Sequence, residues 1–140
     1  MRRMRIYLYT SVARPDFGQV DMVDVLSVSG NNNHRDGITG FMTFDGRRFL
    51  QFVEGEATAL NNLMARLQGD PRHSDIEMLV DLPIRQRLCE GWLMKRLVIT
   101  PGEGADKLLA GLPRNLPLPI QREISAFAAS RYAPRSRLSA

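Results

Sequence analysis

Apolar residues follow two different periods along this chain, and each period predicts a different kind of secondary structure. Alternation with a period of two is typical of strands, and it marks residues 5–11, 38–44, 48–54, 76–82 and 93–99. Spacing of three and four residues predicts one helix over 19–29 and a second from about 56 to 68. The polar segment 31–37 is expected to be a loop.

Residues with special backbone preferences stand at the ends of these segments. Asp16 and Gly30 are the expected caps of the first helix. Asp45-Gly46 predicts a tight hairpin, because such a turn needs a positive φ that glycine tolerates. Pro83 is expected to end the fourth strand, since proline cannot donate a hydrogen bond to a neighbouring strand.

The order of elements predicts an α+β fold with a ferredoxin-like, five-stranded mixed sheet and two helices on one face. The opposite face of that sheet is apolar, because Ile6, Leu8, Leu50 and Phe52 point toward it. Such a face must be covered. We expect the C-terminal residues to cover it with a short helix around 107–110, a proline-rich connection and a second helix over 120–132.

Composition places the chain among ordinary globular proteins. Its 140 residues and 44% hydrophobic content suit one domain with a substantial core. A single cysteine excludes an internal disulfide and fits a reducing compartment. The basic N-terminus resembles the start of a signal peptide, but Arg14 and Pro15 break the short apolar stretch that follows. No segment approaches the roughly 20 apolar residues of a membrane span, so we expect a cytoplasmic protein.

The net charge of +4 and a pI of about 9.8 raise the question of nucleic-acid binding. The basic residues are scattered along the chain, however, and part of the excess lies at Arg131, Arg135 and Arg137. We therefore interpret the charge as an ordinary surface with a basic tail, and nucleic acid is not the expected partner.

Gln51 is the polar residue that fits its surroundings least. It lies in the middle of an apolar strand, and alternation places it on the same face as Phe49 and Val53. A buried amide without hydrogen bonds costs about 1–3 kcal/mol, so Gln51 either lies at a solvent-facing edge or has a buried partner. Tyr9 is a candidate, because the first and third strands are neighbours in a ferredoxin-like sheet. Such a pair could also be purely structural.

Other polar residues carry a structural and a functional interpretation. Asn32 and Asn33 suit a turn or cap, but an amide also offers the donor and acceptor that a flavin's uracil-like edge requires. Arg66 is either a surface residue or a cation for a phosphate or carbonyl. His73 is either a solvated loop residue or, with Arg72, a phosphate contact.

Several enzyme classes lack support in the sequence. Two histidines and one cysteine show no ligand spacing, so we expect no metal. The chain contains neither a P-loop nor a G-x-G-x-x-G motif. Its serines have no evident histidine partner for hydrolase chemistry, and Asp24 and Glu54 are single carboxylates without a pairing argument. We expect a protein that is not an enzyme.

Taken together, these features resemble the BLUF family of blue-light sensors that use FAD. The resemblance spans about residues 4–99 and depends on the order and spacing of several short motifs. They are Tyr9, Asn33 with Ile38-Thr39-Gly40, the run Phe49-Leu50-Gln51-Phe52-Val53-Glu54-Gly55, Asp70-Pro71-Arg72-His73-Ser74 and Gly91-Trp92-Leu93-Met94.

The resemblance implies a sensor domain over residues 1–100 that holds FAD without covalent attachment, with FMN as the alternative. Its ring would lie between the two helices on the buried sheet face. The residues that would contact it are Val25, Asn32, Asn33, Arg66, Leu67, Asp70 and His73. Light would move an electron and then a proton from Tyr9 to the flavin, and Gln51 would rotate or tautomerise and form a new hydrogen bond.

The resemblance also assigns a signalling role to Trp92 and Met94, which alternation in the last strand would place on one face. The family often has phenylalanine at the position of Cys89, and the smaller side chain would loosen this strand. Residues 101–140 leave no room for an output enzyme, so we expect a helical extension that contacts a protein partner, with homodimerisation as a further expectation.

Two other functions compete with this interpretation. A ferredoxin-like module that binds nucleic acid would present aromatic residues on an open sheet face and would show salt-dependent affinity. A flavoenzyme would need a substrate pocket with an acid or base beside the flavin, and the sequence offers no such group beyond Tyr9.

Overall fold

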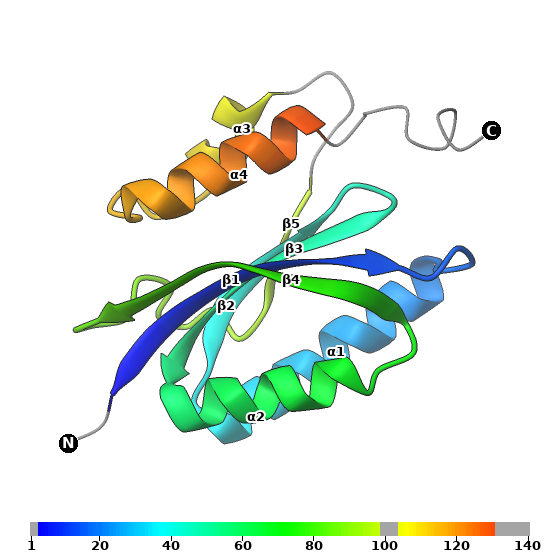
Figure 1. The fold of residues 1–140 in the computed structure, drawn as a ribbon, viewed down its shortest axis with the longest axis horizontal. Coiled ribbons are helices and arrows are strands. Elements are labelled where there is room, and N and C mark those ends of the chain that lie inside the picture. The colour runs from blue at the N-terminus through cyan, green and yellow to red at the C-terminus, as the bar shows by residue number, and fades with distance from the viewer. Residues whose placement is uncertain (1–2, 99–103, 131–140) are drawn as a thin grey trace.

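The fold is a single sheet with a pair of helices on each of its two faces (Figure 1). It comes from a computed structural model, which describes residues 3–98 and 104–130. The five strands are β1 (Met4–Ala13), β2 (Thr39–Phe44), β3 (Arg48–Glu56), β4 (His73–Ile84) and β5 (Lys95–Leu97). The four helices are α1 (Gln19–Asp36), α2 (Ala57–Gln68), α3 (Ala105–Ala110) and α4 (Leu118–Ser130).

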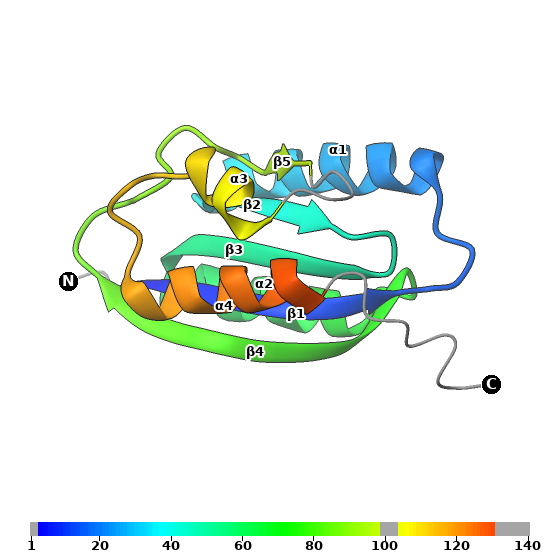
Figure 2. The ribbon, with the colours of Figure 1, turned by 90° about the horizontal axis from the view of Figure 1, so that it is seen from above.

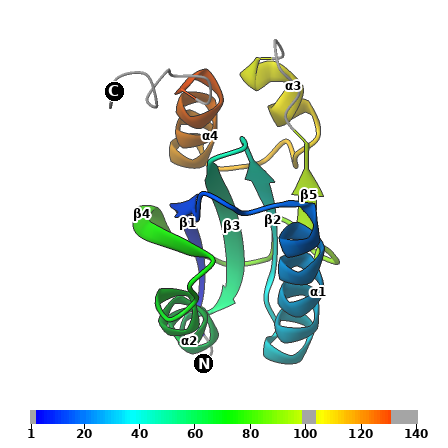
Figure 3. The ribbon, with the colours of Figure 1, turned by 90° about the vertical axis from the view of Figure 1, so that its right-hand side faces the viewer.

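The strand order is β4-β1-β3-β2-β5, and only the β2–β5 pair is parallel among the described strands. The predicted five-stranded mixed sheet is therefore confirmed. Figure 3 shows α1 and α2 beneath one face and α3 and α4 above the other, which confirms the predicted arrangement of layers. In Figure 2, α3 and α4 lie in front of the sheet, on the side away from α2, and α4 runs along β1.

The apolar far face of the sheet is covered as the alternation pattern predicts. Ile6, Leu8 and Phe52 are completely buried there, in one cluster with Ile120 and Ile124 of α4. Burial of a large aliphatic side chain contributes about 1.5–3 kcal/mol, so α4 belongs to the core of the protein. We call this side of the sheet the far face, and the side that carries α1 and α2 the near face.

The first helix is longer than predicted. It continues through the expected loop 31–37 to Asp36 and ends at Gly37, whose φ of 70° is the left-handed conformation typical of a C-cap. Gly30, the expected cap, lies inside the helix. At the other end, Gly18 rather than Asp16 is the N-cap, and the Asp21 carboxylate accepts a hydrogen bond from the Gly18 backbone nitrogen at 2.9 Å.

Two strand predictions were also wrong in their bounds. β4 extends to Ile84, and Pro83 lies inside it, because β4 is an edge strand in which proline is tolerated. β5 is shorter than predicted and begins only at Lys95, while the expected end at Ile99 lies outside the described residues. Likewise, the predicted end of α4 at residues 131–132 lies outside them.

Candidate functional site

Tyr9 and Gln51 lie directly opposite each other on the central strands β1 and β3. Both face the near side of the sheet, and both are buried, with Tyr9 only 1% exposed and Gln51 6% exposed. Burial raises the pKa of the Tyr9 hydroxyl above its usual range, because a phenolate would lack solvation there. Tyr9 therefore keeps its proton well into alkaline solution. The predicted adjacency of these two side chains is present in the structure.

Gln51 has an unsatisfied polar atom. Its side-chain oxygen Oε1 is buried and finds no hydrogen-bond partner among the described residues. A buried amide is rarely left in this condition, because the missing hydrogen bond costs about 1–3 kcal/mol. An unsatisfied amide oxygen that lines a pocket is instead typical of a site that a polar ligand completes.

Two adjoining pockets form a groove between α1 and α2, and Gln51 lies at its floor. One pocket is lined by Phe17, Val25, Phe49, Gln51 and His73, and the other by Asn32, Asn33, Leu63 and Arg66. Both are lined by Leu67, Asp70 and Arg72. The groove thus brings together all seven residues that the sequence analysis singled out as flavin contacts.

Asn33 is fixed at one end of its amide and free at the other. Its Nδ2 donates a 2.5 Å hydrogen bond to the backbone carbonyl of Leu93, whereas its buried Oδ1 has no partner among the described residues. Asn33 itself is 1% exposed. An unpaired acceptor in the groove requires a donor, such as the N3–H group in the uracil-like edge of a flavin.

The residues of the groove therefore fit a flavin. Val25 and Leu67 offer apolar contacts to a flat ring, and Asn33 and Gln51 offer unpaired amide oxygens at its polar edge. Apolar walls with a few orienting polar groups are the usual composition of a cofactor site.

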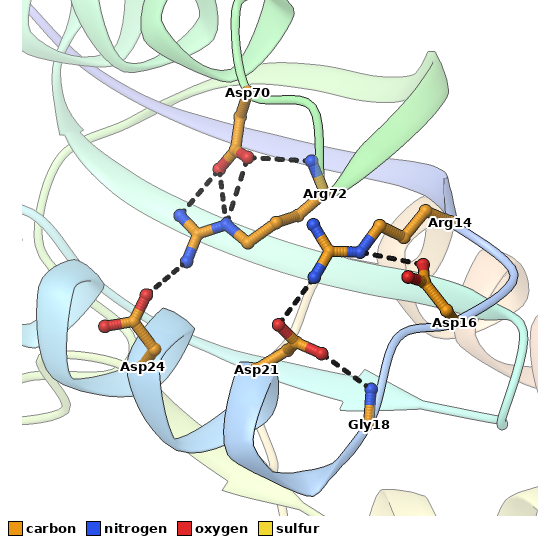
Figure 4. A network of polar contacts seen from close by, with 7 residues as sticks. All are labelled: Arg14, Asp16, Gly18, Asp21, Asp24, Asp70 and Arg72. Carbon is orange, nitrogen blue, oxygen red and sulfur yellow. Dashed lines mark hydrogen bonds and ion pairs between the residues drawn. The ribbon is translucent and has the colours of Figure 1, made fainter.

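The groove ends in a network of charged side chains (Figure 4). The Arg72 guanidinium donates to both carboxylate oxygens of Asp70, at 2.8 to 3.2 Å, and to Asp24 of α1 at 2.8 Å. Hydrogen bonding to Arg72 lowers the pKa of Asp70. Arg14 makes a parallel link to Asp21, at 2.7 Å. Arg72 thereby ties α1 to the turn that follows α2.

His73 and Arg66 occupy more ordinary surroundings. The Nδ1 atom of His73 lies 2.9 Å from the Ser11 hydroxyl, and burial lowers the pKa of the imidazole. His73 begins β4, so it is not the solvated loop residue of the structural interpretation. Arg66 is exposed and pairs with Asp36 at the end of α1, at 3.1 Å.

Trp92 and Met94 lie on opposite sides of the sheet, so the prediction that they share a face was wrong. Trp92 packs on the far-face cluster, edge-on to Phe41 with ring centroids 6.3 Å apart. Met94 packs on the near face, with the clusters that contain Tyr9 and Phe49. Strand alternation does not apply to these two residues, because β5 begins only at Lys95.

Glu54 is a buried residue that the sequence analysis left without a role. It is completely buried on β3, and its carboxylate accepts hydrogen bonds from the backbone nitrogens of Leu88 and Cys89, each at 2.7 Å. A signal for this was present in the sequence: alternation places Glu54 beside Leu50 and Phe52 on the apolar face. A carboxylate there requires several donors.

The Cys89 thiol is expected to react slowly with thiol reagents in the folded protein. It is 2% exposed, and burial, with a further contribution from Glu54, raises its pKa to about 12. At pH 8 we expect labelling by a disulfide reagent to be slow in the native protein and rapid in urea. The folded thiol keeps a proton that the unfolded thiol loses above about pH 8.5, so this thiol's contribution to stability declines as pH rises from there. Rapid labelling of the native protein would contradict this expectation.

Comparisons with known proteins identify related chains. Residues 4–95 match the family model BLUF, described as sensors of blue-light using FAD. The photoactivated adenylate cyclase subunit alpha of Euglena gracilis is 30% identical over 95 residues, which are 68% of this chain and 9% of that protein. This chain thus spans less than a tenth of that relative.

Solved structures show the same similarity in three dimensions. BlrP1 from Klebsiella pneumoniae, determined with FMN and cyclic diGMP, superposes with a TM-score of 0.78 at 30% identity, over 93% of this chain and 36% of the other. BlrB, described as a BLUF protein in its dark state, superposes with a TM-score of 0.70 at 26% identity, over 98% and 95% of the two chains.

Among the described residues, the His, Cys, Asp and Glu side chains form no group of three that could hold a metal ion. Within the same residues, no helix is both long and apolar enough to cross a bilayer.

Proposed function

Since this chain belongs to the BLUF family of blue-light sensors, we propose that it binds FAD without covalent attachment in the groove between α1 and α2 and converts light into a protein signal. The observation that carries the proposal is the unsatisfied side-chain oxygen of Gln51, buried opposite Tyr9 on the groove floor. The family description names FAD, and BlrP1 was determined with FMN. FMN is therefore the alternative ligand.

Asn33, Val25 and Leu67 would hold the flavin. Asn33 would accept a hydrogen bond at its free Oδ1, and Val25 and Leu67 would flank the ring from the two helices. Asn32 and Arg66 would lie at the outer rim, and Asp70 and His73 at the end that carries the ribityl chain. Because Arg72 already donates a hydrogen bond to the Asp70 carboxylate, Asp70 and Arg72 would contact that end of the flavin as a pair.

When bound, the flavin supplies absorption of blue light and acceptance of an electron and a proton. Tyr9 would donate both the electron and the proton, and its raised pKa keeps that proton on the hydroxyl oxygen until then. Gln51 would record the event, because an amide presents an oxygen at one end and an NH₂ group at the other. Turning that amide reverses donor and acceptor at the unsatisfied position without a change in side-chain volume.

We further propose that the chain has no enzymatic activity of its own and acts in the cytoplasm on a protein partner. Residues 1–100 would form the sensor and 101–140 the extension that meets the partner, with α3 and α4 covering the far face. The same cover argues against the nucleic-acid module, because the far face offers no open aromatic platform among the described residues. A second copy of the chain is the alternative partner.

The absorption spectrum before, during and after blue illumination tests the proposal. We expect a structured flavin band that shifts slightly to the red in light and returns in darkness, because a new hydrogen bond to the flavin lowers its excitation energy. A protein that stays colourless after refolding with FAD would refute flavin binding. Steady oxidation of NAD(P)H by the coloured protein would instead favour the flavoenzyme.

A further inference from the structure

The chain between Ile84 and Lys95 forms bends and turns, yet side chains from other elements hold its backbone in place. This segment carries Trp92 on the far face and Met94 on the near face. Asn33 holds it at the carbonyl of Leu93, and Glu54 holds it at the amides of Leu88 and Cys89. We call residues 88–94 the crossing segment.

A continuous path of hydrogen bonds runs from Glu54 to Trp92. The Glu54 carboxylate accepts from the Cys89 nitrogen at 2.7 Å, and the Cys89 carbonyl accepts from the Trp92 nitrogen at 3.0 Å. The Trp92 carbonyl in turn accepts from the Gly40 nitrogen at 2.6 Å. The backbone position of Trp92 therefore depends on a carboxylate of β3 and an amide of β2.

The environment of Glu54 suits a carboxylate and no other side chain of the same size. Oε1 accepts from Leu88, and Oε2 accepts from Cys89 and from the Thr39 hydroxyl at 2.8 Å. Arg87 supports the same corner, because its guanidinium donates to the Thr39 hydroxyl at 3.0 Å and to the Gly37 carbonyl at 2.6 Å. Three donors converge on Glu54, and only a group with two acceptor oxygens can satisfy them all.

We propose that Glu54 is a positioning residue that fixes the crossing segment and thereby sets the place of Trp92 in the dark protein. Glu54 lies three residues after Gln51 on the same strand and points to the opposite face. β3 thus carries the amide beside the groove and the anchor of the crossing segment on one continuous backbone. Asn33 holds the same segment from the groove side, so the two anchors act on opposite faces of the sheet.

The test replaces Glu54 with glutamine. Glutamine keeps one acceptor oxygen but turns an NH₂ group toward a backbone N–H. One of the two hydrogen bonds from the backbone nitrogens is therefore lost. Loss of a hydrogen bond to a charged acceptor should raise hydrogen exchange about tenfold or more at whichever of Leu88 and Cys89 faces the NH₂ group. Trp92 is the only tryptophan in the sequence, so its fluorescence should report the same release as stronger acrylamide quenching.

Glu90→Gln is the matched control, because Glu90 is exposed in the same segment and its replacement removes the same charge. That variant should leave exchange at Leu88 and Cys89 and the quenching of Trp92 unchanged. If Glu54→Gln does not fold, Thr39→Val replaces it. Thr39 bonds to Oε2, so exchange should rise more at Cys89 than at Leu88. Unchanged protection in folded Glu54→Gln, or equal acceleration in Glu90→Gln, would overturn the proposal.

A second measurement, the rate of dark recovery, rests on the proposed light response. It distinguishes a positioning role of Glu54 from a general contribution to stability. A misplaced crossing segment should change the dark recovery rate of the red-shifted band in Glu54→Gln by several-fold, while Glu90→Gln recovers at the parent rate. Faster exchange with unchanged recovery would overturn the link between this anchor and the light response. If the parent protein shows no photocycle, the proposed function fails, and the exchange and fluorescence measurements still decide the role of Glu54.

Discussion

Replacement of Gln51 with leucine is expected to leave a folded, flavin-binding protein whose absorption band does not shift in blue light. Leucine is close to glutamine in size and fits the apolar surroundings of Phe49 and Val53. It removes both ends of the amide, so no donor can form the new hydrogen bond that lowers the excitation energy. The reversible shift should disappear completely, which is the largest functional effect expected of a single side chain here.

Gln51→Leu is not expected to destabilise the protein, although most substitutions in a core do. The Gln51 oxygen is buried without a partner, so its removal also removes a desolvation cost of about 1–3 kcal/mol. In urea titrations without flavin, the free energy of unfolding of Gln51→Leu should equal or exceed that of the parent. Gln68→Leu, at the exposed end of α2, is the control and should shift normally in light. A full reversible shift in Gln51→Leu would remove Gln51 from the mechanism.

Replacement of Gly40 with alanine is expected to cause the largest loss of stability. A Cβ atom at this position would lie 1.9 Å from the Phe52 carbonyl oxygen and 2.9 Å from its carbonyl carbon. Both are backbone atoms of the neighbouring strand β3, so relief requires β2 and β3 to separate. The Gly40 nitrogen also holds the Trp92 carbonyl, at 2.6 Å. We expect a loss of about 3 kcal/mol, the upper end of the usual cost of overpacking and a large part of the 5–15 kcal/mol typical of a domain.

Gly30→Ala is the matched control for that experiment. Gly30 lies inside α1, and a Cβ atom there would meet no described atom within 4 Å. Alanine is favoured over glycine in a helix by about 0.5–1 kcal/mol, so this variant should be slightly more stable than the parent. Urea unfolding followed by circular dichroism measures both. A Gly40→Ala protein within 1 kcal/mol of the parent would mean that β2 and β3 can separate at little cost.

Local pattern was sufficient to predict the five-stranded sheet, the adjacency of its first and third strands, and Tyr9 as a candidate partner of Gln51. Strand periodicity decides which side chains share a face, and the order of strands and helices leaves few topologies. Together these two constraints place Tyr9 beside Gln51 without any knowledge of distances. They also show that Leu50 and Phe52 need a cover, which α4 provides.

The end of α1 and the sides taken by Trp92 and Met94 were decided by tertiary contacts. Asparagine is a weak helix former, and a glycine followed by three asparagines predicts a helix end. The helix continues because Asn33 is buried and bonded to Leu93. Trp92 and Met94 face opposite sides because the crossing segment is held by distant side chains and has no strand period of its own.

Glu54 shows most clearly where sequence reasoning ends. Alternation predicts a carboxylate on an apolar face, and physical chemistry demands donors for it. Those donors, the backbone nitrogens of Leu88 and Cys89, lie more than thirty positions away and carry no mark in their side chains. The local sequence determined the strands and the faces of their residues. Only the folded chain decided which backbone groups meet them, because backbone hydrogen-bonding groups are the same at nearly every position.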